Sequence, residues 1–264
     1  MRIALYQGPG GGSVPGNLEV MARHAREAAE SGAELLVLPE MFLTGYNIGT
    51  DTRALAEPAD GPSARKAAAL AKEHGLALCY GFPERDGDAV YNSLLLVGPD
   101  GSPLASYRKA HLFGPYEQKM FAPGDELAVV RLGGWSVGLA ICYDIEFPEM
   151  IRSLALAGAE LVLCPTALME PYGFVAETVV PCRSWENQVF AAYANRSGSE
   201  GELTYCGLSC VAAPDGTVLT RAGKGEELLL AELDRQAVDA ARKVNPYLAD
   251  RRPSLYASPV KQLP

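Results

Sequence analysis

The sequence predicts a layered protein of mixed α/β (α+β) class. Two observations support this prediction. Short apolar runs that contain β-branched residues alternate along the chain with alanine-rich stretches of helical period. In addition, residues 91–109 contain two runs of strand character joined by a Pro-Asp-Gly turn. Such a turn favours a hairpin, so antiparallel strand pairs are expected beside the alternating strands and helices.

The elements before the hairpin follow from local signals. We expect strands at 2–8, 34–40 and 76–82 and helices at 17–32 and 63–75. Each strand is a short apolar run. The first helix has Asn17 as a candidate cap, apolar residues at helical spacing, and Gly32 at its end. The second helix ends at Gly75, because glycine readily adopts the left-handed conformation that closes a helix.

Two sequence fragments recur in the same order. GAELLVLPE (32–40) resembles GAELVLCPT (158–166), and GPDGSPL (98–104) resembles APDGTVL (213–219). A duplicated half-fold and common connector sequences explain this equally well, and both explanations stay open. Two similar halves inside one domain are favoured over two domains, because no stretch has the composition of a linker. We therefore expect a single domain over 1–264, with a C-terminal tail at roughly 245–264.

Composition and charge exclude several classes of partner. Apolar residues make up 48% of the chain and charged residues 21%, which is ordinary for a folded globular protein. The net charge of -9, without a basic run, argues against nucleic acid and anionic membranes as partners. The six cysteines show no metal-ligand spacing, so neither a metal site nor a disulfide framework is expected. No stretch approaches a membrane span or a secretory segment, which predicts a cytoplasmic protein.

Three apolar strands end in a reactive residue, namely Glu40, Lys109 and Cys142. Strand ends are where α/β proteins collect their functional groups. A carboxylate, an ammonium and a thiol would supply a base, an electrostatic stabiliser and a nucleophile. Each residue alone has an ordinary interpretation, as a solvated glutamate, a surface lysine or a buried structural cysteine. The combination is what predicts a hydrolase with a cysteine nucleophile.

Cys142 has the most specific local setting of the three. It lies between a buried strand at 135–141 and a helix that should begin near Phe147 or Pro148. A thiol on that turn would point out of the sheet. Backbone N–H groups at the start of the helix would favour the thiolate and could also hold an oxyanion.

Other catalytic arrangements fit the sequence less well. The segment GWSVG (134–138) matches a serine nucleophile elbow, but it precedes a strand instead of joining a strand to a helix. The three histidines (24, 74 and 111) all precede Ser136, so the order serine, acid, histidine of α/β-hydrolases is excluded. No histidine follows Cys142, which excludes a papain-like site. A dyad of Cys142 with His111 on another fold stays open. The glycines at 8–12 lack the third glycine of a dinucleotide-binding motif, because Ser13 takes its place.

Three segments resemble the signature regions of the nitrilase, or carbon-nitrogen hydrolase, superfamily. They are PEMFLTGYN (39–47), YRKAHLFGPYE (107–117) and GLAICYDIEFPE (138–149), in the family's order. The resemblance runs over nearly the whole chain. It implies an α-β-β-α sandwich that dimerises into a four-layer α-β-β-α-α-β-β-α core, so a homodimer or higher homo-oligomer is expected.

The resemblance also implies a role for each matching residue. Glu40 takes the position of the general base, Lys109 that of the oxyanion stabiliser and Cys142 that of the nucleophile. Glu117 matches a second glutamate that positions the substrate nitrogen, and Tyr143 would offer its backbone N–H to the oxyanion. The implied reaction is acyl transfer through a thioester on Cys142, with release of ammonia and then hydrolysis. It requires no metal or organic cofactor.

The branch of the superfamily predicts the substrate. The segments are most similar to those of aliphatic omega-amidases such as 5-aminovaleramidase, which implies a small linear primary amide. Candidate residues for the substrate pocket are Tyr46, Phe113, Ala167 and Tyr172. An ω-amino group on the substrate would require an acid, for which Glu146 and Glu170 are candidates.

Alternatives remain open inside and outside the superfamily. A nitrilase or a carbamoyl-amine hydrolase would use the same three reactive groups. Carbamoyl hydrolases of amino acids usually carry arginines just after the cysteine segment, where this chain has Ile145 and Glu146. A non-catalytic module that keeps the fold would be expected to have lost a reactive group, and all three are present.

Overall fold

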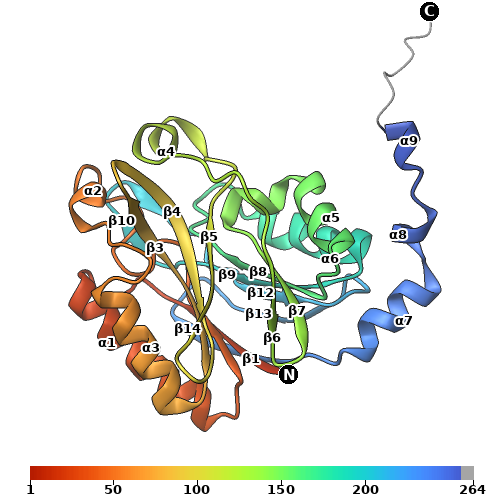
Figure 1. Ribbon diagram of the computed structural model, residues 1–264, viewed down its shortest axis with the longest axis horizontal. Helices are drawn as coiled ribbons and strands as arrows, with labels where there is room; N and C mark the ends of the chain where they lie inside the picture. Colours follow the sequence, from red (N-terminus) through yellow and green to blue (C-terminus); the bar gives the residue numbers. More distant parts are fainter. Residues whose placement is uncertain (257–264) are drawn as a thin grey trace, which may run out of the picture.

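Two six-stranded sheets form the centre of the molecule (Figure 1). The computed structural model describes residues 1–256, and residues 257–264 lie outside that description. The first sheet has the order β14 (Glu227–Glu232), β1 (Arg2–Gln7), β2 (Leu35–Val37), β3 (Ala77–Asp86), β4 (Ala89–Val97) and β5 (Pro103–Arg108). The second has the order β13 (Val218–Arg221), β12 (Cys210–Ala212), β9 (Phe190–Ala194), β8 (Leu161–Pro165), β7 (Trp135–Leu139) and β6 (Val129–Leu132). A separate short pair, β10 (Ser199–Glu200) and β11 (Leu203–Thr204), completes the strands described.

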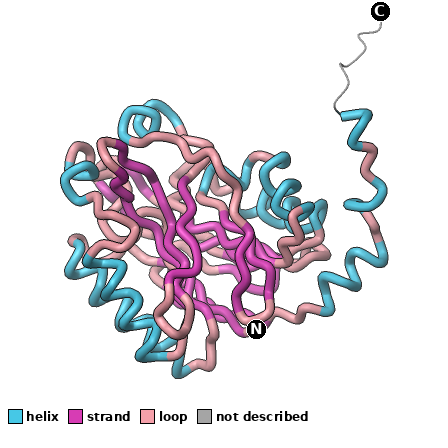
Figure 2. Tube along the Cα trace, viewed as in Figure 1, coloured by secondary structure: helices cyan, strands magenta, loops and turns pink. Residues whose placement is uncertain are grey.

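Helices cover the outer face of each sheet, as Figure 2 shows. On the first sheet they are α1 (Val14–Glu30) and α3 (Pro62–His74), and on the second α5 (Pro148–Leu156) and α6 (Val180–Asn187). Further helical segments are α2 (Asp51–Leu55), α4 (Gly114–Met120), the 3-10 turn η1 (Cys142–Glu146), the π-helical turn η2 (Val175–Val179) and α7 (Gln236–Val244). The layers thus follow the order α-β-β-α, which confirms the predicted fold class.

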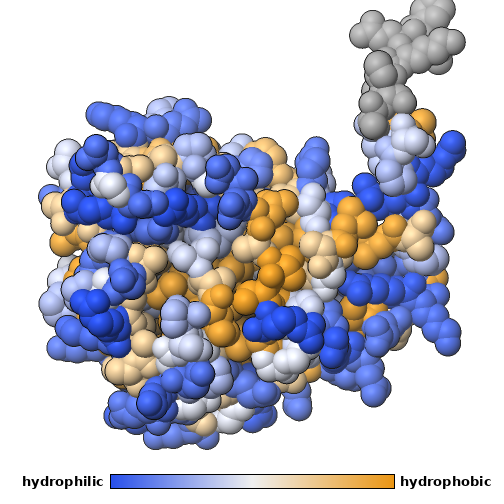
Figure 3. Space-filling view, viewed as in Figure 1, coloured by the Kyte–Doolittle hydropathy of each residue, from blue (hydrophilic) through white to orange (hydrophobic). Residues whose placement is uncertain are grey.

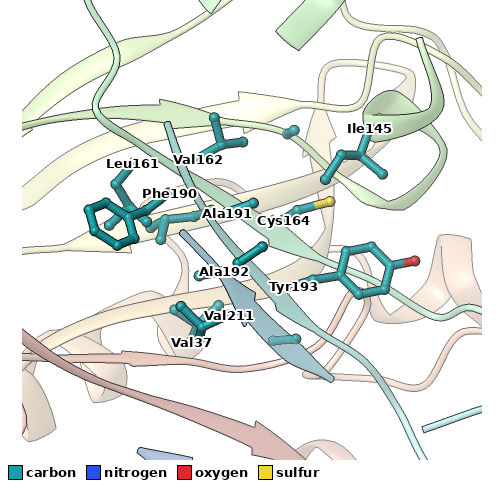
Figure 4. Packing of buried hydrophobic residues seen from close by; sticks show 14 of the residues in the cluster. Val37, Ile145, Leu161, Val162, Cys164, Phe190, Ala191, Ala192, Tyr193 and Val211 are labelled. Atoms are coloured by element: carbon teal, nitrogen blue, oxygen red, sulfur yellow. The ribbon is translucent and has the colours of Figure 1, made fainter. Parts of the chain in front are cut away.

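Strand β1 shows why the strands appear in the sequence as continuous apolar runs. Ile3 and Leu5 belong to the core between the sheets, whereas Ala4 and Tyr6 belong to the core under α1 and α3. Side chains alternate across a strand, so a strand covered on both faces needs apolar residues at every position. Figure 4 shows the same core around β8, β9 and β12, with Val37 contributed by the opposite sheet.

The two recurring fragments lie at equivalent places in the two sheets. Residues 32–40 lead into and out of β2, which pairs in parallel with β1 and β3. Residues 158–166 contain β8, which pairs in parallel with β7 and β9. The two Pro-Asp-Gly turns connect β4 to β5 and β12 to β13, both antiparallel pairs. Each half therefore has the same strand order and the same directions.

The first helix starts earlier than predicted. Its cap is Ser13, whose Oγ accepts a hydrogen bond from the N–H of Gly16 at 3.2 Å. Asn17, the predicted cap, is buried inside the first turn instead. Its Nδ2 donates to the carbonyl of Leu43 at 2.9 Å, and its Oδ1 accepts from the N–H of Gly11 at 2.6 Å. This asparagine therefore ties the glycine-containing N-terminal loop to the loop that follows Glu40, a contact between distant segments that sequence signals cannot reveal.

The C-terminal region leaves the sandwich after β14. Helix α7 is followed by α8 (Tyr247–Asp250) and α9 (Pro253–Tyr256), and these three extend from one side of the molecule in Figure 1. The predicted tail at 245–264 begins directly after α7, and its last eight residues lie outside the described residues. Figure 3 shows apolar residues gathered on the face where Figure 1 places β6, β7 and α5. Within residues 1–256, no helix combines the length and the apolar character needed to cross a membrane.

Candidate active site

Lys109 and two carboxylates form a buried array at one end of the first sheet. Glu40 follows β2, Lys109 follows β5, and Glu117 lies on α4. The Nζ of Lys109 lies 2.8 Å from Oε1 of Glu40 and 2.7 Å from Oε1 of Glu117. All three side chains have no exposed surface. The structure thus brings together the predicted base, the predicted lysine and the second glutamate.

The hydrogen bonds of Glu117 fix its carboxylate completely. Its Oε1 accepts from Lys109 and also from the hydroxyl of Tyr46 at 2.7 Å. Its Oε2 accepts from the backbone N–H of Phe113 at 2.8 Å. Tyr46 and Phe113, both predicted as pocket residues, therefore hold Glu117 in place.

The two carboxylate oxygens of Glu40 differ in their hydrogen bonds. Its Oε1 accepts from Lys109 and from Nδ2 of Asn92, the latter at 2.7 Å. Its Oε2 is buried and has no hydrogen-bond partner among the residues that the structure describes. Burial raises the pKa of Glu40, and the charge of Lys109 opposes that shift. This oxygen is therefore left without a donor among the described residues.

Cys142 enters the site from the second sheet. It follows β7 at the start of η1 and has a φ of 47°, in the left-handed region that residues other than glycine rarely adopt. Such strain is typical of functional positions. Burial and the charge of Glu40 raise the pKa of the thiol, whereas Lys109 opposes them. These charge interactions place Cys142 close to the Lys109 array.

The ammonium of Lys109 stays charged inside the protein. Burial alone would lower its pKa, but the charges of Glu40 and Glu117 outweigh burial and raise that pKa well above the usual value. A buried ammonium next to a thiol is suited to stabilise negative charge that develops during attack.

His111 does not pair with Cys142. Its Nδ1 lies 2.8 Å from Oδ1 of Asp144, and its ring stacks on Phe147 with centroids 3.8 Å apart. Asp144 is fully buried and also accepts a hydrogen bond from the hydroxyl of Tyr107 at 2.8 Å. The alternative of a Cys-His dyad on another fold is therefore wrong, because the imidazole is held by this aspartate.

Aromatic rings surround the cysteine turn. The ring of Phe113 meets the edge of Tyr143 at 5.2 Å and that of Tyr172 at 5.9 Å between centroids. Tyr172 is 48% exposed, so it lies at the outer edge of this group. Ala167 is fully buried in a small cluster that also contains Tyr46. The four predicted pocket residues thus fall into two groups, Tyr46 with Ala167 and Phe113 with Tyr172.

The two candidate acids differ in their surroundings. The carboxylate of Glu170 pairs with Lys224 at 2.8 Å on the surface, and both side chains are largely exposed. Glu146, at the end of η1, is half-buried. Burial raises its pKa, against the opposing charges of Lys109 and Arg183. The charge of Lys109 therefore acts on Glu146, whereas Glu170 is paired with Lys224.

Two further residues hold the site and were not predicted. Glu200 accepts hydrogen bonds from the backbone N–H groups of Tyr46 and Asn47, both at 2.9 Å, and from the hydroxyl of Tyr205 at 2.7 Å. Arg196, only 2% exposed, forms an ion pair with Glu200. This pair fixes the loop that carries Tyr46. Nothing in the local sequence marks this contact, because Glu200 and Tyr46 are 154 positions apart.

Comparison with known proteins agrees with this geometry. Residues 2–243 match the family described as carbon-nitrogen hydrolase. A curated relative from Pseudomonas protegens, named "Hydrolase in pqqF 5'region", is 52% identical over 260 residues, which cover 97% of this chain and 90% of the relative. An omega-amidase from Mus musculus is 34% identical over 266 residues, covering 97% and 96% of the two chains.

A solved structure extends the comparison to the fold. The amidase from Nesterenkonia sp. AN1 superposes with a TM-score of 0.85 at 34% identity, and the alignment covers 97% of this chain and 95% of that one. In that structure, a variant of the amidase carries the acetamide moiety of fluoroacetamide on its active-site cysteine. The predicted resemblance is thereby confirmed: this chain belongs to the carbon-nitrogen hydrolase family, and it is an amidase-type enzyme of the nitrilase superfamily that acts on carbon-nitrogen bonds other than peptide bonds.

Proposed function

We propose that this enzyme hydrolyses small linear aliphatic primary amides to a carboxylate and ammonia through a thioester on Cys142. The main support is the buried array of Glu40, Lys109 and Glu117 beside a strained cysteine. It combines a base with a free oxygen, a fixed ammonium and a nucleophile. That set is sufficient for acyl transfer.

In the first half of the reaction, Oε2 of Glu40 takes the proton from the Cys142 thiol as sulfur attacks the amide carbon. Burial raises the pKa of Glu40, which makes its carboxylate a stronger base toward the thiol. The negative oxygen of the tetrahedral intermediate is held by Lys109 and by the backbone N–H of Tyr143.

The second half releases the products. Glu117 orients the substrate nitrogen, and Glu40 returns its proton to that nitrogen as the carbon-nitrogen bond breaks. Ammonia leaves and a thioester remains on Cys142. Glu40 then removes a proton from water as the water oxygen attacks the thioester. The carbon-sulfur bond breaks, Glu40 returns that proton to the sulfur of Cys142, and the acid leaves and ionises to the carboxylate.

Charge near the site favours a neutral or cationic acyl chain. Glu146 is half-buried, and its carboxylate accepts no hydrogen bond from the part of the chain described. The neighbouring cation, Arg183, is committed to the backbone carbonyls of Ile145 and Glu146 and to the carboxylate of Glu186. Arg183 is therefore not free to bind a second carboxylate on the substrate. An ω-ammonium group could pair with the carboxylate of Glu146.

A panel of matched substrates tests this function. Linear amides and nitriles of four to six carbons, each with and without an ω-amino group, are compared by ammonia release. We expect the amides to turn over faster than the nitriles, and the ω-amino amides to have the lowest KM. The Glu146→Gln variant should lose that preference and keep kcat on the plain amides. Faster nitrile turnover would make the enzyme a nitrilase instead.

We also propose that the chain forms a homodimer. Large apolar side chains are exposed on the outer helices, including Leu156 on α5, Trp185 on α6 and Val244 on α7. Exposed apolar residues on one region of a globular protein favour association. Sedimentation velocity over a range of concentrations should give the mass of a dimer or a larger oligomer, and a monomer throughout would refute the proposal.

A further inference from the structure

Asn92 contacts both the base and the lysine of the site. It lies on β4, opposite Pro83 of β3, and is fully buried. Its side-chain Nδ2 donates to Oε1 of Glu40 at 2.7 Å, and its backbone carbonyl accepts the N–H of Lys109 at 2.8 Å. One residue therefore fixes the carboxylate through its side chain and the lysine through its backbone.

We propose that Asn92 is a positioning residue that restricts the proton transfer of Glu40 to Oε2. This inference rests on the function proposed above, because it takes Glu40 as the base. A carboxylate has two oxygens that can accept a proton, and a base works only if the oxygen facing the thiol is the one that does so.

The hydrogen bonds around Glu40 support this role. Oε1 accepts two strong donors, the ammonium of Lys109 and the amide of Asn92. A proton on Oε1 would collide with one of them, so Oε1 cannot act as the acceptor while both are in place. Oε2 has no partner in residues 1–256 and is fully desolvated. The proton therefore has one place to go.

The amide group also adjusts the strength of the base without adding charge. Burial raises the pKa of Glu40, and the hydrogen bond from Asn92 opposes burial because it favours the ionised form. A second cation at this position would oppose burial as well, but it would cancel the charge of the carboxylate. Asn92 therefore favours the ionised form of the carboxylate and adds no charge to the surroundings of Lys109.

The adjacent residue provides a matched control. Ser93 is also fully buried on β4, and its Oγ donates to Oε2 of Glu84 at 2.7 Å, on the opposite face of the sheet. Asn92→Ala and Ser93→Ala therefore each remove one buried hydrogen bond to a carboxylate from the same strand. They differ in which carboxylate loses its donor, and Glu84 keeps its hydrogen bonds from Arg108.

The experiment is the pH dependence of kcat/KM on a primary amide for both variants. For Asn92→Ala we expect the acid limb to move up by about one pH unit, because a charge-assisted hydrogen bond no longer stabilises the ionised Glu40. At a pH on that limb, kcat/KM should fall about tenfold. Ser93→Ala should leave the limb in place. An unshifted limb in Asn92→Ala, or an equal shift in both variants, would overturn the proposal.

Two further variants make the result decisive. Asn92→Asp has nearly the same shape, replaces the donor with a second acid, and should move the acid limb further up, since a like charge raises the pKa of Glu40. If Asn92→Ala does not fold, an unshifted limb in Asn92→Asp overturns the proposal by itself.

Glu40→Gln distinguishes a failure of the proposed function from a failure of the role of Asn92. Turnover retained in Glu40→Gln would refute the proposed function, whereas an inactive Glu40→Gln with unshifted Asn92 variants would refute only the role of Asn92.

Discussion

The ammonium of Lys109 lies 2.7 Å from Oε1 of Glu117, and solvent reaches neither side chain. A buried ammonium would be costly alone, and so would a buried carboxylate. Because Glu40 contacts the same ammonium, the three groups are stable only as a set. The geometry of this set determines both the stability of the site and the consequences of changing any of its members.

Replacing the nucleophile should abolish the reaction and preserve the fold. Cys142→Ala removes only the sulfur, so we expect circular dichroism and the melting temperature to stay close to those of the wild type, with no ammonia released above the rate without enzyme. Cys182 is an exposed cysteine on α6, and Cys182→Ala should keep full activity. Turnover by Cys142→Ala would contradict the thioester mechanism.

Removing the charge of Glu117 should affect stability as well as catalysis. Glu117→Gln leaves Lys109 with one charged partner in a buried position, which should cost about 3 kcal/mol of unfolding free energy in urea titrations. Because the Glu117 carboxylate would no longer position Lys109 and the substrate nitrogen, kcat should fall by about 10²-fold. Tyr46→Phe removes one neutral donor to the same carboxylate and should cost only about 1 kcal/mol. Equal losses in the two variants would show that the charge of Glu117 has no special role.

The ion pair of Arg196 and Glu200 should control the loop that carries Tyr46. Glu200→Ala removes the acceptor of two backbone N–H groups in that loop, so we expect KM to rise, kcat to fall and the loop to become accessible to limited proteolysis. Glu202 lies two residues further on and is exposed, so Glu202→Ala is the control and should behave as the wild type. A Glu200→Ala enzyme with unchanged kinetics would separate this ion pair from the site.

Glu146 should make the stability of the protein depend on pH. Burial raises its pKa in the folded state above the ordinary value near 4.3 of an unfolded chain. Its contribution is therefore fully present below the unfolded pKa and is lost as the pH rises through the folded pKa. Because glutamine does not titrate, Glu146→Gln should melt at the same temperature as the wild type near pH 4, and above it at pH 7. Melting curves across that range measure the difference, and a difference that is independent of pH would contradict this assignment.

The sequence alone determined the reactive groups and the layered fold. Glu40, Lys109 and Cys142 stand in segments of distinctive local composition at the ends of apolar runs, and Glu117 follows the lysine at a fixed spacing. The strands can be recognised in the sequence because a strand covered on both faces must be apolar throughout. Local signals do not fix the start of the first helix, because Ser13 and Asn17 are both good caps; in the structure Ser13 is the cap and Asn17 bonds to Leu43.

The tertiary structure alone decided how these groups act. Asn92 reaches Glu40 across 52 positions of sequence, and Glu200 reaches the Tyr46 loop across 154. The tertiary structure also pairs His111 with Asp144 rather than with Cys142, and it pairs Glu170 with Lys224 on the surface. A hydrogen bond between distant segments depends on where the two sheets bring their ends together. An asparagine or a glutamate that makes such a bond has the same local sequence signals as one that lies in solvent.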